Sequence, residues 1–114
     1  MASDLVVGEL RIQSGTGLVE AGDRVLGLSV REFELLVALA SRAGSIVTRE
    51  ELFALVWQAP LRNGDRSVDV YVHKLRVKLE QALPEWHYIH THVGFGYRLQ
   101  PERSHDFHDA VTGR

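Results

Sequence analysis

Four cations and a histidine recur within one short stretch of the sequence, and their spacing fits a nucleic-acid contact. Over residues 65–79, apolar side chains at i, i+4, i+7 and i+11 form one stripe of a helix: Val68, Val72, Leu75 and Leu79. The opposite side carries cations, an imidazole and small apolar groups: Arg66, Val70, His73, Lys74 and Val77. A helix with one core-facing stripe and one such side suits the DNA major groove.

The distribution of charge supports this interpretation better than the total does. The 114 residues carry a formal net charge of −2, whereas nucleic-acid-binding domains are often basic. Residues 66–78, however, hold four Lys or Arg and one Asp, while residues 1–61 hold five Lys or Arg and eight Asp or Glu. The positive charge therefore lies on the candidate helix. We expect modest, salt-sensitive affinity from so few phosphate contacts.

Short strands are predicted before this helix. Alternation of polar and apolar residues, separated by glycine-containing turns, indicates strands over residues 9–13, 18–20 and 24–28. Residues 5–7 begin the first strand or form one before it. These pieces predict a small antiparallel sheet.

Two capping boxes, with Ser or Thr followed three residues later by Glu, open two further helices at Ser29 and Thr48. The first helix is expected to end near Gly44 and to bury Phe33, Leu36, Val37, Leu39 and Ala40. Residues 45–47 are a short extended link. The second helix is expected to bury Leu52, Leu55, Val56 and Trp57. Residues 58–64 form a loop, and the third helix runs from about residue 66 to residue 83, before Pro84.

Two short strands around a glycine turn are predicted over residues 88–99. The order of sheet, three helices and hairpin predicts an α+β fold, a winged helix-turn-helix with an N-terminal antiparallel sheet and a C-terminal β-hairpin wing. Residues 1–100 are expected to form this one domain, and residues 101–114 a polar tail.

Three stretches together resemble a known family: residues 28–36, residues 47–57, and residues 65–99 with the ending Gly94-Phe95-Gly96-Tyr97-Arg98. Over residues 8–99 the chain resembles the OmpR/PhoB-type winged-helix domain, the DNA-binding half of bacterial response regulators in two-component systems. The resemblance implies sequence-specific binding of double-stranded DNA and regulation of transcription. It also implies two copies bound to a direct repeat, through self-association on DNA. A cytoplasmic location is expected from the composition, which has no cysteine, no membrane-spanning apolar run and no basic N-terminal region followed by an apolar segment.

The resemblance assigns roles residue by residue. Lys74 is implied as the main base-contacting side chain, since an ammonium can donate to guanine O6 and N7. Val70 can pack on a thymine methyl, with Val77 on the same side. Phosphate contacts are implied for Arg66, Tyr71, His73 and Arg76. Thr91 corresponds to a residue that contacts the backbone or a base. Asp69 is interpreted as a local partner of Arg66 or His73, or as an exposed helix acid.

The wing departs from the family pattern at Val93, where an arginine that enters the minor groove is common. His90 and His92 flank Thr91 and are two candidates for pH-dependent phosphate contacts. A pair of solvent-facing histidines on a strand fits the sequence equally well.

The loop at residues 58–64 matches the segment with which the family contacts RNA polymerase. The implied contact residues are Pro60, Leu61, Arg62 and Asn63, although a plain connection between two helices also fits the sequence.

Other classes of function have little support. The chain has no cysteine, no phosphate-binding glycine loop and no acid–base motif, so we expect neither an enzyme nor a cofactor. His87, His90 and His92 cluster in sequence, but convergent metal ligands are not expected, and we predict no metal site. No apolar run reaches membrane-spanning length, which predicts no membrane contact.

The competing hypothesis is a winged helix that binds a partner protein instead of DNA. Net acidity and Val93 favour it, whereas the exposed cations Arg66, Lys74 and Arg76 favour DNA. A receiver domain with its phosphoacceptor aspartate has no room in 114 residues, so a stand-alone regulator and an isolated effector domain both stay open.

Overall fold

The structure, a computed structural model, describes residues 4–104. A four-stranded antiparallel sheet of order β1-β2-β3-β4 comes first, formed by β1 (Asp4–Val7), β2 (Leu10–Gln13), β3 (Leu18–Ala21) and β4 (Arg24–Val25). The three helices are α1 (Val30–Ala40), α2 (Arg49–Trp57) and α3 (Ser67–Ala82). A second antiparallel sheet has the order β5-β7-β6, formed by β5 (Ile46–Thr48), β6 (Trp86–His92) and β7 (Gly96–Arg103). The predicted α+β winged-helix architecture is confirmed.

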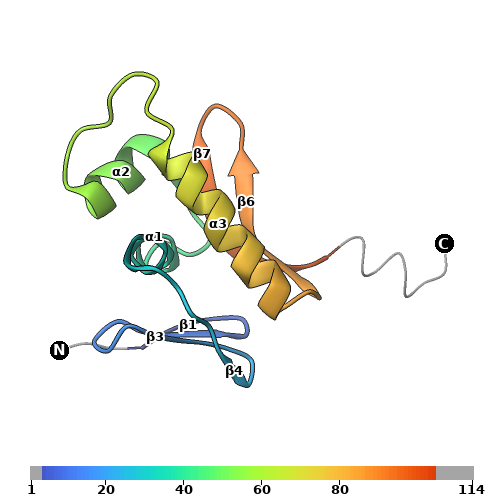
Figure 1. The fold of residues 1–114 in the computed structure, drawn as a ribbon. Coiled ribbons are helices and arrows are strands. Elements are labelled where there is room, and N and C mark those ends of the chain that lie inside the picture. Colours follow the sequence, from blue (N-terminus) through green and yellow to red (C-terminus); the bar gives the residue numbers. More distant parts are fainter. Residues whose placement is uncertain (1–3, 105–114) are drawn as a thin grey trace, which may run out of the picture.

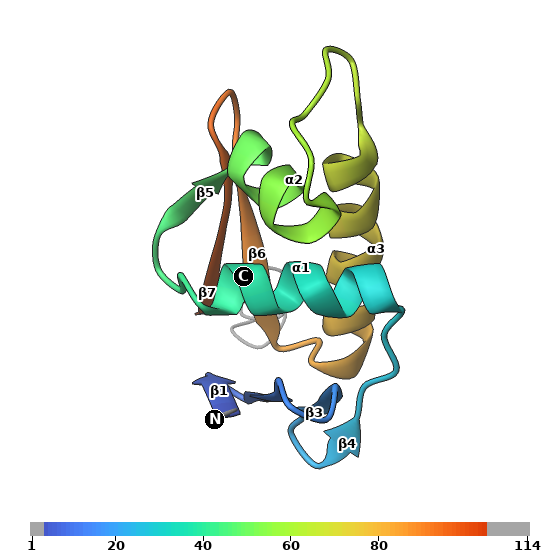
Figure 2. The same ribbon diagram turned by 90° about the vertical axis from the view of Figure 1, so that its left-hand side faces the viewer.

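The helices lie between the two sheets. Figure 2 shows α1 across the middle of the molecule, with the N-terminal sheet on one side and α2 on the other. In Figure 1, α3 runs along the β6–β7 hairpin, whose turn projects at the end of the molecule opposite the N-terminal sheet. The hairpin is therefore a wing beside the exposed side of α3. In the part of the chain that the structure describes, no helix combines the length and apolar character needed to cross a membrane.

The apolar stripe of α3 is confirmed as core. Its four members are at most 2% exposed: Val68, Val72, Leu75 and Leu79. Val70 and Val77, on the opposite side, are exposed. The helix begins at Ser67, one residue later than expected, because the Asp65 carboxylate accepts a hydrogen bond from the Ser67 amide at 2.9 Å and leaves Arg66 at the N-cap position.

Both predicted capping boxes are present, at Ser29–Glu32 and Thr48–Glu51. The predicted buried faces of the first two helices need correction. In α1, Leu35 and Ala38 are buried, while Phe33 and Val37 are only partly buried.

In α2, Phe53 is buried and Leu55 is 44% exposed, so the prediction for Leu55 was wrong. The side of α2 that packs on α1 and α3 carries Leu52, Phe53 and Val56, and Leu55 projects from another side.

The expected link at residues 45–47 is a strand of the wing sheet. β5 pairs with β7, with Val47 opposite Tyr97 and Thr48 opposite Gly96. A Cβ atom at Gly96 would collide with the carbonyl oxygen of Val47, so the close approach of the two backbones requires glycine there. This glycine therefore serves the β5–β7 contact, whereas Gly94, at φ +82°, forms the wing turn.

Two predicted boundaries were wrong. The third predicted strand, over residues 24–28, is reduced to Arg24–Val25. Residues 101–103, predicted as the start of a tail, are the end of β7: Arg103 pairs with Trp86 of β6, and its guanidinium lies 5.2 Å from the centre of the Trp86 ring. This cation–π contact favours pairing of the two strands as far as Arg103, beyond the apolar residues of β7. Residues 105–114 of the predicted tail lie outside the described residues.

Candidate nucleic-acid interface

The exposed side of α3 carries most of the predicted contact residues. His73 and Lys74 are exposed, and Tyr71 is half-buried beside them. The Lys74 ammonium lies 4.8 Å from the centre of the Tyr71 ring, within cation–π distance. Val70 and Val77 add exposed apolar atoms to the same side. This side of the helix can donate hydrogen bonds, carry positive charge and pack on methyl groups.

Arg76 connects α3 to the wing. Its Nη2 donates a hydrogen bond to Thr91 Oγ1 at 2.8 Å. Within the described residues, its buried Nε atom has no hydrogen-bond partner. The structure thus brings two predicted contact residues, Arg76 and Thr91, together at the junction of helix and wing.

Lys78 belongs to the fold rather than to this surface. Its Nζ lies 2.7 Å from a Glu32 carboxylate oxygen and 3.2 Å from the carbonyl oxygen of Gly27. Burial raises the pKa of Glu32, but hydrogen bonds from Lys78 and Ser29 and the charge of Lys78 outweigh it, and the net pKa is lowered. One of the four cations counted for the helix is therefore held by a buried carboxylate.

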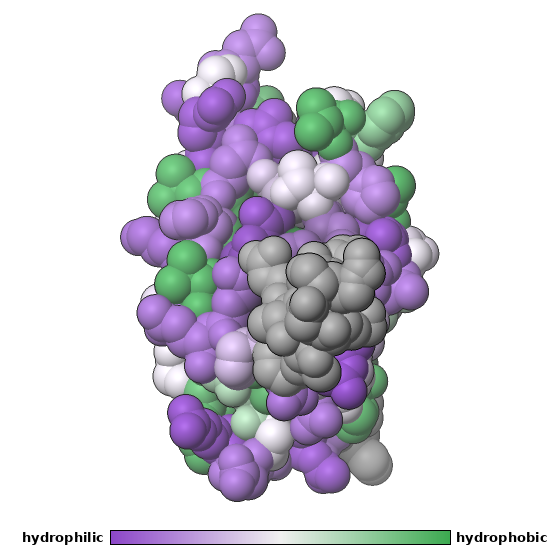
Figure 3. All heavy atoms as spheres, turned by 90° about the vertical axis from the view of Figure 1, so that its right-hand side faces the viewer, coloured by the Kyte–Doolittle hydropathy of each residue, from purple (hydrophilic) through white to green (hydrophobic). Residues whose placement is uncertain are grey.

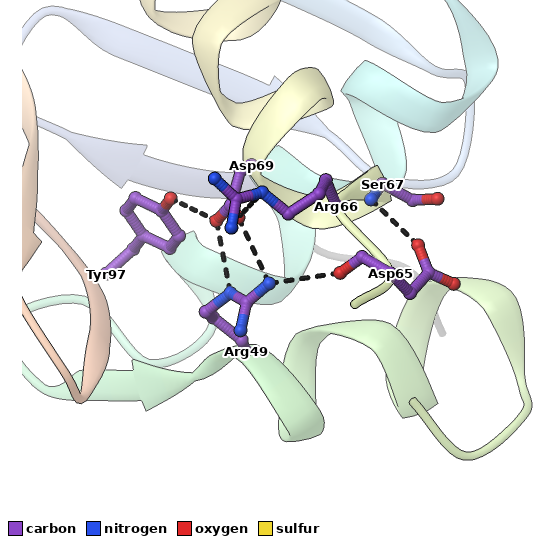
Figure 4. A network of polar contacts seen from close by, with 6 residues as sticks. All are labelled: Arg49, Asp65, Arg66, Ser67, Asp69 and Tyr97. Atoms are coloured by element: carbon purple, nitrogen blue, oxygen red, sulfur yellow. Dashed lines mark hydrogen bonds and ion pairs between the residues drawn. The ribbon is translucent and has the colours of Figure 1, made fainter. Parts of the chain in front are cut away.

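A polar network ties the start of α3 to α2 and to the wing (Figure 4). The Asp69 carboxylate accepts hydrogen bonds from Arg49 Nε and Nη2 at 3.1 and 3.0 Å, and from the Tyr97 hydroxyl at 2.5 Å. Arg66 Nε lies 3.8 Å away, which confirms the expected pairing of Asp69 with Arg66. Arg49 also donates to the carbonyl oxygen of Asp65 at 3.0 Å.

The protonation states in this network are complementary. Burial raises the pKa of Asp69, but hydrogen bonds from Tyr97 and Arg49 and the nearby positive charges lower it overall. Burial and the bond to Asp69 raise the pKa of Tyr97 to about 12. Tyr97 is thus a neutral donor to an ionised carboxylate at neutral pH. Arg49 and Tyr97 were not predicted, because the sequence shows only a lone acid within a cationic helix.

The wing tip is apolar and exposed. Val93 is 89% exposed and Phe95 is 69% exposed, on either side of Gly94. Figure 3 shows hydrophobic patches at the upper edge of the molecule, on the side of the wing, among hydrophilic residues. An open cleft of about 450 Å³ separates the wing tip from the starts of α2 and α3, and its walls include Arg49, Arg66 and Asp69.

The two wing histidines make contacts inside the sheet. Thr91 and Tyr97 reach α3 through Arg76 and Asp69, and strand alternation places His90, His92 and Arg98 on the other face. The His90 Nε2 atom lies 2.8 Å from the carbonyl oxygen of Gln100. Arg98 Nε donates a hydrogen bond to His92 Nε2 at 3.0 Å.

Two of the described histidines, His87 and His90, lie close together on β6. A bulge in β6 near His87 brings the His87 and His90 rings edge to face, with centroids 4.6 Å apart. Across residues 4–104, no group of three or more potential metal ligands converges.

The loop between α2 and α3 presents Pro60, Arg62 and Asn63 to solvent, and Leu61 packs against the core. Gln58 ends α2 with φ +58°, a left-handed conformation that turns the chain into this loop. The loop projects at the same end of the molecule as the wing turn (Figure 1).

Two helices followed by a two-stranded wing, with cations on the exposed side of the last helix, define the winged helix-turn-helix class of proteins. Residues 23–99 match the family described as transcriptional regulatory protein, C terminal. The chain belongs to this family of OmpR/PhoB-type winged-helix domains, which confirms the resemblance found in the sequence.

Relatives in sequence are bacterial regulators. The chain is 32% identical over 106 residues to the alkaline phosphatase synthesis transcriptional regulatory protein PhoP of Bacillus subtilis, covering 93% of this chain and 44% of the relative. It is 32% identical over 94 residues to the transcriptional regulatory protein CreB of Escherichia coli, covering 82% and 41%. The chain thus spans less than half the length of these relatives.

Solved structures agree in fold. The RstA DNA-binding domain of Klebsiella pneumoniae, in complex with RstA box, superimposes with a TM-score of 0.79 at 32% identity, covering 88% of this chain and 99% of that one. The DNA-binding domain of CpxR from Escherichia coli gives a TM-score of 0.78 at 30% identity, covering 86% and 96%.

Proposed function

We propose that this domain binds specific sequences in double-stranded DNA and thereby regulates transcription, with α3 in the major groove. The observation that carries the proposal is the division of α3: four buried apolar residues on one side, and exposed Val70, His73 and Lys74 on the other. The solved complex of the RstA domain with RstA box supports it, because the two folds superimpose along nearly the whole RstA chain.

Roles within the interface follow from position. Lys74 donates to a guanine edge, and Val70 and Val77 lie beside it, where they suit thymine methyl groups. Phosphate contacts are proposed for Arg66 and His73 along the helix, whereas the Tyr71 ring lies under Lys74 and its contact with that side chain supports a role within the protein. Arg76 and Thr91 form the junction with the wing and face the same duplex. The internal contacts of His90 and His92 support a structural role for these two better than a phosphate contact.

Two partners besides DNA are proposed. A domain with few free cations binds weakly alone, so we expect two copies on a direct repeat, with half-sites one helical turn apart. The exposed residues Pro60, Arg62 and Asn63, with Leu61, are proposed as a contact for RNA polymerase. These functions place the protein in the bacterial cytoplasm.

Selection of bound duplexes from a random pool tests the function. We expect enrichment of a sequence repeated in tandem, two protein copies per tandem site, and a steep fall in affinity with salt. Arg66→Ala should reduce the salt slope by about one, whereas Arg24→Ala, on the exposed β4 at the far end of the molecule, should leave it unchanged. A pool that yields no enriched sequence would instead favour a winged helix that binds a partner protein.

A further inference from the structure

Aromatic rings form a continuous path from the interior of the helix cluster to the proposed DNA surface. Phe53 and Trp57 of α2 stack with centroids 4.9 Å apart and planes 6° apart. Trp57 meets Tyr71 of α3 edge to face, with centroids 5.7 Å apart and planes at 61°. Lys74 then lies over the other end of this path, 4.8 Å from the Tyr71 ring centre.

The inner end of this path is fixed by packing. The Arg31 guanidinium of α1 lies 5.1 Å from the centre of the Trp57 ring, and its Nη1 donates to the carbonyl oxygen of Val56 at 2.7 Å. Trp57 therefore contacts Phe53, Arg31 and Tyr71 at once. These contacts leave its ring little freedom, and Trp57 in turn limits the movement of Tyr71.

The outer end needs such support. A lysine ammonium sits on a flexible four-carbon stem, and immobilising it on binding costs conformational entropy. Tyr71 and Lys74 are three residues apart on one helix, so their side chains lie on the same side. The Tyr71 ring beneath the ammonium restricts the Lys74 side chain in the free protein. Less conformational entropy is then lost when DNA binds.

We propose that Trp57 and Tyr71 are positioning residues, which hold the Lys74 ammonium where it contacts a base. The Trp57 ring acts through Tyr71, and the aromatic face of Tyr71, rather than its hydroxyl, is the part that matters. Only the effect on DNA binding rests on the proposed function, since the contact between Tyr71 and Lys74 exists in the free protein.

The first test uses the protein without DNA. Lys74 and Lys78 are the only lysines in the chain, so selective ¹³C labelling of lysine gives two ε-methylene signals in an NMR spectrum. We expect ring-current shielding to move the Lys74 signal upfield. Lys78, which pairs with Glu32, serves as the internal reference. Tyr71→Phe should keep the shift, and Tyr71→Leu and Trp57→Leu should abolish or reduce it. An unshifted Lys74 signal in the parent overturns the proposal.

The second test measures affinity for the selected DNA site. Loss of an exposed cation–π contact corresponds to about a two- to five-fold weaker affinity for Tyr71→Leu, with Tyr71→Phe close to the parent. In a Lys74→Ala background, Tyr71→Leu should have no further effect. A loss of the same size in that background, or equal losses for Phe and Leu, overturns the proposal.

Trp57 is tested by two substitutions of different severity. Trp57→Phe keeps a ring against Tyr71 and should bind more tightly than Trp57→Leu, again only when Lys74 is present. Thermal unfolding of each variant shows that it is folded at the assay temperature. If the Lys74 signal is shifted but the parent selects no DNA, the proposed function fails while the contact stands, so the two failures are distinguishable.

Discussion

Two carboxylates hold α3 in place, and they differ in what surrounds them. The Glu32 side chain is 4% exposed, accepts a hydrogen bond from the Ser29 amide and forms an ion pair with Lys78, near the end of the helix that faces the N-terminal sheet. The Asp69 side chain is 30% exposed and gathers Arg49, Arg66 and Tyr97 at the other end, beside the wing. The first carboxylate serves stability. The second holds cations at the edge of the proposed DNA surface.

Because of this difference, the cations counted in the sequence of α3 are not the same set as the cations that lie near the wing in the structure. Lys78 contributes to the cationic appearance of the sequence but is held by Glu32, whereas Arg49, outside the helix, adds a cation near the wing cleft. Removing Lys78 is costly, because the Glu32 carboxylate stays buried and loses the charge that balances it. A half-exposed cluster costs less to disturb, because water can solvate the charges that lose a partner.

The two lysines of α3 give the largest expected contrast. Lys78→Met leaves the Glu32 carboxylate buried without its partner and should lower the free energy of unfolding by about 3 kcal/mol at pH 7. Lys74→Met should change it by less than about 0.5 kcal/mol, because Lys74 is exposed. Urea unfolding monitored by circular dichroism measures both. Similar losses of unfolding free energy in the two variants would show that Lys78 stabilises the fold no more than the exposed Lys74 does.

The effect of Lys78→Met should depend on pH. The lowered pKa of Glu32 in the parent means that its ionised form stabilises the fold above its ordinary pKa of 4.5, and that this contribution is lost as the pH falls through the lower, folded-state value. In Lys78→Met, burial instead favours the protonated acid. The difference in unfolding free energy between parent and variant should therefore narrow as the pH falls from above 4.5, where Glu32 of the variant takes up its proton, to below 4.5, where Glu32 of the parent does. A difference in unfolding free energy that stays constant down to pH 3.5 would show that Lys78 stabilises the fold by packing alone.

At the other end of α3, the charge and the hydrogen bonds of Asp69 can be separated. Asp69→Asn removes the charge and should cost about 1–2 kcal/mol of stability, since the group is only partly buried. It should also release Arg49 and Arg66 and steepen the salt dependence of DNA binding. Tyr97→Phe removes one hydrogen bond and should cost about 1 kcal/mol without changing the salt slope. A slope that moves in both variants would mean that wing orientation, not free charge, controls it.

A smaller effect is expected at the apolar wing tip. If Phe95 packs against DNA, Phe95→Ala should weaken binding by about two- to ten-fold with an unchanged salt slope, because no cation is lost. Val93→Arg should strengthen binding and steepen the slope. Affinities at four salt concentrations test both variants. Unchanged binding by Phe95→Ala would leave the wing tip outside the interface.

The smallest effect concerns the histidines. A phosphate beside an imidazole favours the protonated ring, so DNA binding through such a contact should tighten as the pH falls from 7.5 to 5.5. We expect His73→Gln to remove most of this trend and His90→Gln/His92→Gln to retain it, because only His73 lies exposed on α3. DNA affinity measured across this pH range at constant ionic strength tests the expectation. If His90→Gln/His92→Gln loses the pH dependence, these two histidines contact phosphates, as the sequence suggested.

Local patterns predicted much of this molecule. The capping boxes and the stripe from Val68 to Leu79 depend on residues a few positions apart, and they were confirmed. Leu55 was misassigned because α2 packs on two helices, and the sequence does not show from which side they approach. The bond from Tyr97 to Asp69 joins residues 28 positions apart and requires α3 and the wing to be in place.

Lys74 is proposed to contact a base rather than a phosphate, and the DNA affinity of Lys74→Ala distinguishes the two roles. Parent and variant should be titrated against the selected site and against its single-base-pair variants at one salt concentration. We expect a loss of about 1–3 kcal/mol on the selected site and a relaxed preference at one base pair. An equal loss on every duplex would make Lys74 a phosphate contact, and undiminished binding would contradict the placement of α3 in the major groove.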